Sequence, residues 1–146
     1  MITWLVSLAI GGMLHLQPES LAAAPFDITI GQQQVDLRAP LIARAPGVRM
    51  VLFVRKGVPA EFERANPAGS ITAHLSTTDG RAITLEHTGY YYYHGMAGLI
   101  LTEADAASRG ERFAHLELEA KVPLQRVHLV WLDRLARRVQ DLETSL

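Results

Sequence analysis

Histidine is the residue type with the most chemistry to offer in this chain, which contains six histidines and no cysteine. Imidazole groups bind copper and zinc, particularly together with carboxylates or thioethers. Two sets of residues have types and spacing that suit a copper or zinc site. The first set is His115, Glu117 and His128, and the second is His94 with Met96, which share a short glycine-containing loop.

The first set depends on a predicted β-hairpin with its turn at residues 121–124. This hairpin pairs residues whose numbers sum to 245, so Glu117 lies opposite His128 and His115 lies diagonal to it. The three side chains then share one outward face and form a candidate Zn²⁺ or Cu²⁺ site. They are equally consistent with a solvent-facing polar pair, because an exposed face lacks the surrounding groups that orient metal ligands. We therefore expect no cofactor, with copper or zinc as the alternative.

Four consecutive tyrosines, at positions 90–93, are the most unusual feature of the composition. Successive strand residues point to opposite faces, so two tyrosines enter the edge of the core and two face outward. Outward tyrosines are favoured at binding surfaces, although tyrosine is also simply a good strand former. We predict a partner-binding surface that consists of Tyr90, Tyr91, Tyr92, Tyr93, His94 and Met96.

Catalytic motifs are missing from the sequence. It contains no G-x-S-x-G, H-E-x-x-H, P-loop or G-x-G-x-x-G pattern, and the absence of cysteine excludes thiol nucleophiles, thiolate metal sites and disulfides. The formal net charge is -1, with 14 basic and 15 acidic residues, which gives no electrostatic reason to expect nucleic acid binding. These observations favour a protein that is not an enzyme.

The first 22 residues have the character of a signal peptide. Residues 2–16 are almost continuously apolar and uncharged, and a polar segment and a run of alanines follow them. We expect cleavage after Ala22, although the leader lacks the usual lysine or arginine. The apolar stretch is shorter than the roughly 20 residues that span a bilayer, so an uncleaved inner-membrane anchor is the alternative. The expected location is the periplasm or the exterior.

The rest of the chain has the pattern of an antiparallel all-β domain, with short apolar runs between Gly, Pro, Asn and Asp residues. The register of one hairpin can be predicted. Its loop is residues 78–80, with Gly80 at the bulge position, and the residues that lie opposite each other on its two strands have numbers that sum to 158. Short helices are expected at 59–65 and 103–109. Strands are expected near 26–30, 34–42, 48–55, 70–77, 81–88, 89–93, 98–102, 112–120 and 125–132, and adjacent ones can merge.

These elements predict an immunoglobulin-like β-sandwich of seven to nine strands at residues 23–134, with a small β-barrel as the alternative. Residues 135–146 form a tail or a short helix. The functional hypothesis is an exported binding module of the cell envelope that acts by protein–protein contact, such as an inhibitor or an immunity-type protein. A periplasmic copper- or zinc-binding module and a membrane-tethered structural component are the alternatives.

Overall fold

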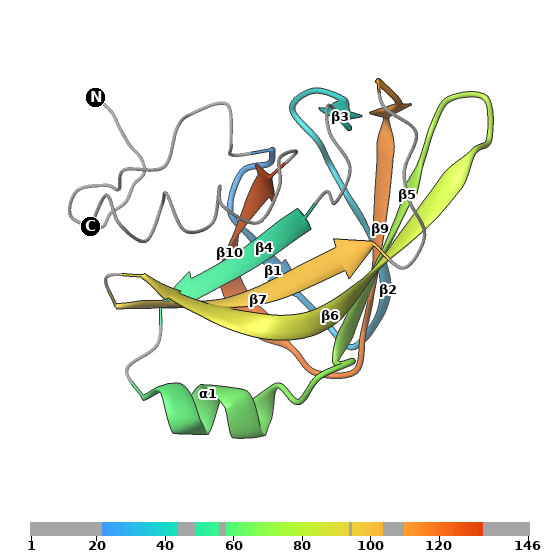
Figure 1. The fold of residues 1–146 in the computed structure, drawn as a ribbon. Coiled ribbons are helices and arrows are strands. Elements are labelled where there is room, and N and C mark those ends of the chain that lie inside the picture. The colour runs from blue at the N-terminus through green and yellow to red at the C-terminus, as the bar shows by residue number, and fades with distance from the viewer. Residues whose placement is uncertain (1–21, 44–48, 56–57, 94, 104–109, 133–146) are drawn as a thin grey trace.

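The computed structural model describes residues 22–43, 49–55, 58–93, 95–103 and 110–132 (Figure 1). This part of the chain consists of strands and one short helix. In chain order they are β1 (Phe26–Ile28), β2 (Gly31–Val35), β3 (Leu41–Ile42), β4 (Arg49–Arg55), α1 (Pro59–Ala65), β5 (Ile71–Ser76), β6 (Ala82–Tyr93), β7 (Met96–Glu103), β8 (Arg112–Phe113), β9 (His115–Ala120) and β10 (Leu124–Leu132).

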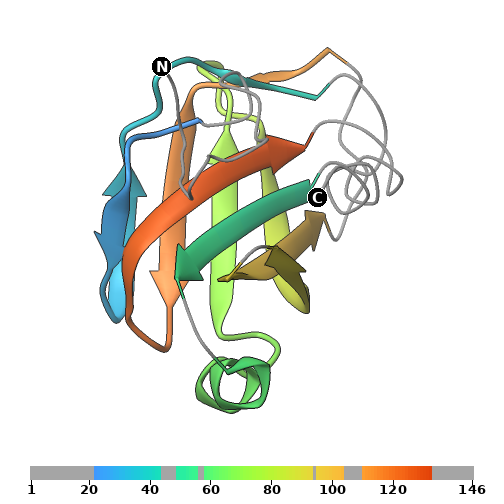
Figure 2. The same cartoon turned by 90° about the vertical axis from the view of Figure 1, so that its left-hand side faces the viewer.

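Eight strands form one antiparallel sheet in the order β1-β10-β4-β7-β6-β5-β9-β2, and β3 pairs separately with β8. The two edge strands, β1 and β2, are consecutive in the chain and are joined by Thr29 and Ile30 alone. In a flat sheet these edges would be about 34 Å apart, whereas this link reaches about 11 Å at most. The sheet therefore curls until its edges approach each other, which gives the barrel-like wall of Figures 1 and 2.

The antiparallel all-β prediction is confirmed, as are the helix at 59–65 and the first hairpin. In that hairpin Leu75 pairs with Ile83 and Ala73 pairs with Leu85, as the sum of 158 requires. Gly80 has a φ of 93°, a left-handed conformation that suits glycine at this position of the loop. The two strands expected at 81–88 and 89–93 merge into β6. The helix expected at 103–109 lies largely outside the described residues.

The hairpin predicted between β9 and β10 is wrong. Strand β9 pairs with β5 and β2, whereas β10 pairs with β4 and β1. The outward acidic residues of β9 find other partners: Glu119 lies 3.4 Å from His74 and Glu117 accepts a hydrogen bond from Gln34. Alternating apolar and acidic residues determine which face of a strand is buried, but they do not determine which strand lies beside it.

The core fills the interior of the curled sheet, and α1 covers one end of it (Figure 1). Phe62 of α1 is 1% exposed, and its ring packs edge-on against the rings of Tyr90 and Tyr92. Strand β4 is buried on both faces, as its apolar sequence predicts: Leu52 faces inward and Phe53 faces outward, and each is at most 1% exposed.

Side-chain and loop hydrogen bonds connect the two edges of the sheet. The Gln33 amide accepts a hydrogen bond from the Thr29 backbone N–H at 2.8 Å and donates one to the Asp27 carbonyl at 3.0 Å. Ala22 donates its N–H to the Leu129 carbonyl, and its own carbonyl accepts the N–H of Arg38. Ala22 is thus part of the folded domain, so cleavage after this residue, which stays a prediction, would remove both bonds.

Replacing Gln33 by alanine is expected to lower the free energy of unfolding by about 1 kcal/mol, because two backbone groups beside the edge strands lose their partner. Hydrogen exchange at the Thr29 amide should accelerate more than exchange at amides within β4. Gln32→Ala, at an exposed neighbouring position, is the control. An unchanged exchange rate at Thr29 would show that Gln33 does not hold the two edges together.

Candidate functional site

The three residues of the predicted metal site are not brought together. His115 and Glu117 lie on β9, whereas His128 lies on β10, and these strands are not neighbours in the sheet. Within the described ranges, no group of three or more His, Cys, Asp or Glu residues is arranged to hold a metal ion. Of the second set, Met96 is 2% exposed and His94 lies outside the described residues.

The tyrosines are less accessible than the partner-binding hypothesis expects. Tyr90 and Tyr92 face the helix end of the core, where the Tyr90 hydroxyl donates to the Asn66 carbonyl and the Tyr92 hydroxyl donates to the Glu63 carboxylate. Burial and this carboxylate raise the pKa of Tyr92 to about 12. Tyr91 faces outward but is only 7% exposed. For Tyr93 the structure describes the backbone but not the side chain. A partner-binding role for this run stays a prediction.

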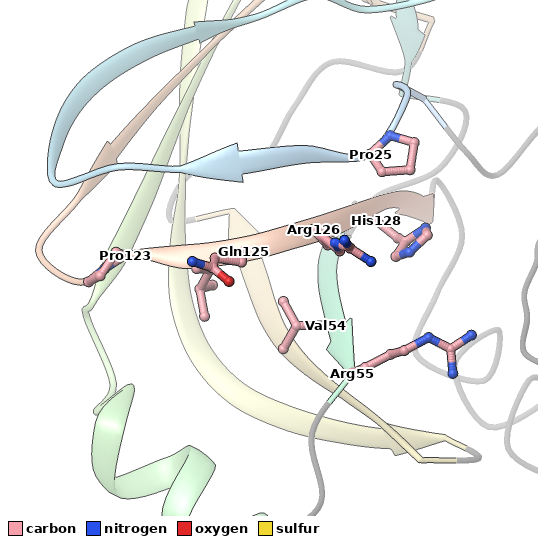
Figure 3. Close-up of a pocket in the computed structure, with 8 residues that line it drawn as sticks. Pro25, Val54, Arg55, Pro123, Gln125, Arg126 and His128 are labelled. Atoms are coloured by element: carbon pink, nitrogen blue, oxygen red, sulfur yellow. The ribbon is translucent and has the colours of Figure 1, made fainter.

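A pocket of about 780 Å³ lies elsewhere, along the first half of β10, beside the end of β4 and next to Pro25, which immediately precedes β1 (Figure 3). Its described lining combines apolar side chains, one amide and three basic side chains. We call it the basic pocket. Its residues are Pro25, Val54, Arg55, Pro123, Leu124, Gln125, Arg126 and His128.

A β-bulge in β10 sets the position of Arg126. Phe26 pairs with Val127 and Ile28 pairs with Leu124, so Asp27 of β1 faces two residues of β10, Gln125 and Arg126. Arg126 has a φ of 55°, and its N–H donates to Asp27 Oδ1 at 2.9 Å. A left-handed backbone is unfavourable for a residue with a side chain, and bulges often redirect a side chain at a functional site. The strain at Arg126 therefore marks this position for a functional hypothesis.

The basic pocket has a positive electrostatic character. Arg55 and Arg126 carry fixed charges, and none of the described residues that line the pocket is acidic, although Asp27 lies directly beside it. Burial, together with the positive charge of Arg55, lowers the pKa of His128 below its usual 6.5, so this imidazole is mainly neutral at pH 7. Two guanidinium groups and a neutral imidazole form a set of hydrogen-bond donors suited to a carboxylate or a phosphate.

The sequence pattern indicates a functional role for one residue of the basic pocket, His128, and predicts that it belongs to a metal site. Arg126 and Arg55 were missed. A signal for the bulge is nonetheless present in the sequence: the buried residues Leu124 and Val127 are three positions apart, whereas an unbroken strand buries every second residue. The same spacing separates His87 and Tyr90, where β6 also changes its register.

The two histidines with depressed pKa values predict that the protein is less stable in mild acid. Burial lowers the pKa of both His87 and His128 below 6.5. As the pH falls through 6.5, the unfolded chain binds protons before the folded chain does, so the free energy of unfolding decreases. The decrease ends once the pH is below both folded pKa values, and its slope is at most about 1.4 kcal/mol per pH unit for each histidine.

Urea unfolding at intervals between pH 7.5 and pH 5, within about the range where histidine titrates, measures this dependence. The variants His87→Gln and His128→Gln should each flatten it, and His115→Gln, at an exposed position, serves as the control. An unfolding free energy that increases as the pH falls would contradict the prediction.

Comparison with known protein families, with curated proteins and with solved structures gives no match for this chain. In the part of the chain that the structure describes, no helix has the length and apolar character needed to cross a membrane.

Proposed function

We propose that this chain is a barrel-like, non-enzymatic binding module exported to the cell envelope, and that its basic pocket holds an anionic group of its partner. The apolar leader at residues 2–16 and the lack of catalytic motifs support the export and the binding role. The positive lining of the pocket supports the anion. The expected partner is a protein, and every protein offers side-chain or terminal carboxylates.

The observation that carries this proposal is the conformation of Arg126. A left-handed backbone costs a residue with a side chain about 1–2 kcal/mol, and glycine would adopt it without this cost. Arginine at this position gives up stability and gains a guanidinium in the pocket that also contains Arg55. Strained residues of this kind cluster at ligand-binding sites.

Titration of the ¹⁵N-labelled protein with acetate and with inorganic phosphate, at constant ionic strength, tests the proposal. Saturable chemical-shift changes should concentrate at Arg55, Arg126 and His128. The variant Arg126→Gln should weaken the binding about tenfold or more, in line with the loss of a charge-assisted contact. Arg64→Gln removes an exposed arginine of α1, which does not line the pocket, and should leave the binding unchanged. Shifts spread evenly over the surface, or none, would contradict the proposal.

A further inference from the structure

Strands β10, β4, β7 and β6, which lie side by side in the sheet, have apolar residues on their outer face as well (Figure 1). Val51 and Phe53 of β4 alternate with the inward-facing Leu52, so both point outward. Residues opposite each other in an antiparallel sheet share a face, so the register extends this set across the neighbouring strands. We call it the outer apolar face. Its residues are Val130 of β10, Val51 and Phe53 of β4, Met96 and Gly98 of β7, and Tyr91 of β6.

The outer apolar face is shielded from water. Val51, Phe53 and Val130 are each at most 1% exposed. Neighbouring side chains of one sheet pack against each other sideways and leave their tips in water, so burial this complete requires a second layer above the sheet. Among the described residues, every buried apolar side chain outside these four strands packs into the interior core, on the other face of the sheet. This leaves the chain outside the described ranges to supply the second layer.

We propose that residues 133–146, which directly follow β10, form this layer by packing on the outer apolar face as an amphipathic helix. Leu135, Val139 and Leu142 are spaced i, i+4 and i+7, which places them on one side of a helix. The sequence of this segment contains no glycine or proline. It begins with Asp133, a residue type favoured at the N-cap of a helix.

The dimensions of the face fit such a helix. From β10 to β6 there are three strand spacings, about 14 Å in all. A helix over residues 133–146 is about 21 Å long, so it can start beside β10 and cross β4 and β7 as far as β6. In the middle of this path, a Cβ atom on Gly98 would lie 2.8 Å from Val51 Cγ1 and 3.0 Å from the Phe53 ring. The Val51 and Phe53 side chains thus fill the space above Gly98 and give the helix a closed apolar surface to pack on.

The leader is the other apolar segment outside the described ranges, and its composition suits this role less well. A helix on the surface of a protein needs a polar side that faces water. Residues 2–16 contain no charged residue. In the segment 133–146, by contrast, Arg134, Arg137 and Asp141 lie on the side of the helical projection opposite to the apolar residues.

Paramagnetic broadening in the full chain tests the proposal. Because the chain contains no cysteine, an introduced cysteine is the single attachment point for a nitroxide label. A label on Arg137→Cys, on the polar side of the expected helix, should broaden the amide signals of Phe53 and Gly98. The amides of Gln34 and Glu119, on β2 and β9, should keep their intensity, because these strands are not part of the outer apolar face.

A pair of neighbouring substitutions tests the contact itself. Val139→Asp, added to the labelled chain, should lower the ratio of docked to undocked segment about tenfold or more, because docking would bury an unpaired carboxylate. The broadening at Phe53 and Gly98 should weaken accordingly. Gln140→Asp introduces the same charge on the polar side and should leave the broadening unchanged. Circular dichroism shows that the sheet is intact in both variants.

The alternative occupants of the outer apolar face give different results. The same label on Ser7→Cys places the probe in the leader, and selective broadening of Phe53 and Gly98 from that position alone would overturn the proposal. So would broadening in a mixture of labelled ¹⁴N protein and unlabelled ¹⁵N protein, because it would show that the segment docks on a second copy. Equal broadening of all four reporter amides by the label on Arg137→Cys would also contradict docking on this face.

Discussion

Replacing Phe62 by alanine is expected to lower the free energy of unfolding by about 3–5 kcal/mol. The Phe62 ring is 1% exposed, and it contacts Tyr90 and Tyr92 at ring-centre distances of 6.2 and 6.4 Å. It is the buried residue of α1, a helix of seven residues without a side-chain N-cap. A helix this short is not stable alone, so its attachment to the end of the barrel-like sheet depends on this ring.

Urea unfolding followed by circular dichroism measures this effect. Val58→Ala is the matched control, because Val58 immediately precedes α1 but is 49% exposed, and a change there should stay within about 0.5 kcal/mol. Phe62→Leu should lie between the wild type and Phe62→Ala, since it keeps part of the buried volume. A loss of less than about 1 kcal/mol for Phe62→Ala would show that other contacts close this end of the barrel-like sheet.

Replacing Arg126 by glycine is expected to change ligand binding and stability in different directions. Affinity for anionic ligands should fall about tenfold or more, because one guanidinium leaves the basic pocket. The free energy of unfolding should stay the same or increase by up to about 1 kcal/mol, because glycine adopts a φ of 55° without steric cost. The greater freedom of glycine in the unfolded chain offsets part of this gain.

The variant Arg126→Ala separates these two effects. It also removes the guanidinium, so it should bind anions as weakly as Arg126→Gly, but it keeps the strained backbone and should be the less stable of the two by about 1 kcal/mol. Urea unfolding and acetate titration of both variants provide the comparison. If Arg126→Gly is the less stable variant, the bulge is not strained and the argument for a functional arginine loses its basis.

Much of the fold follows from local pattern. The turn at Gly80 and the alternation beside it determine the β5–β6 register to the residue, and Pro59 with Asn66-Pro67 delimits α1. These signals act between residues that are close in the chain. The neighbours of β9 and β10 could not be obtained in this way, because alternating strands of similar length are interchangeable partners until the whole sheet is assembled.

The candidate site was harder to anticipate for the same reason. The predicted metal site assumed that His128 lies opposite Glu117, and the actual neighbour of His128 is Phe53 of β4. Arg55 and Arg126 come from strands that are about 70 positions apart in the chain but adjacent in the sheet. Only the three-residue spacing between Leu124 and Val127 indicated a bulge, and it gave no indication of the side chains on the neighbouring strand.

The two-residue link between β1 and β2 also has a consequence for the order in which the protein folds. Each of these early strands pairs with a late one: β1 with β10 and β2 with β9. The Asp27–Arg126 hydrogen bond spans 99 positions. Contacts of such long range are entropically costly and slow to form. A nascent chain that has reached only β7 has no partner for β1 or β2, so β2 stays exposed to pairing with other chains until β9 emerges, and β1 until β10 emerges.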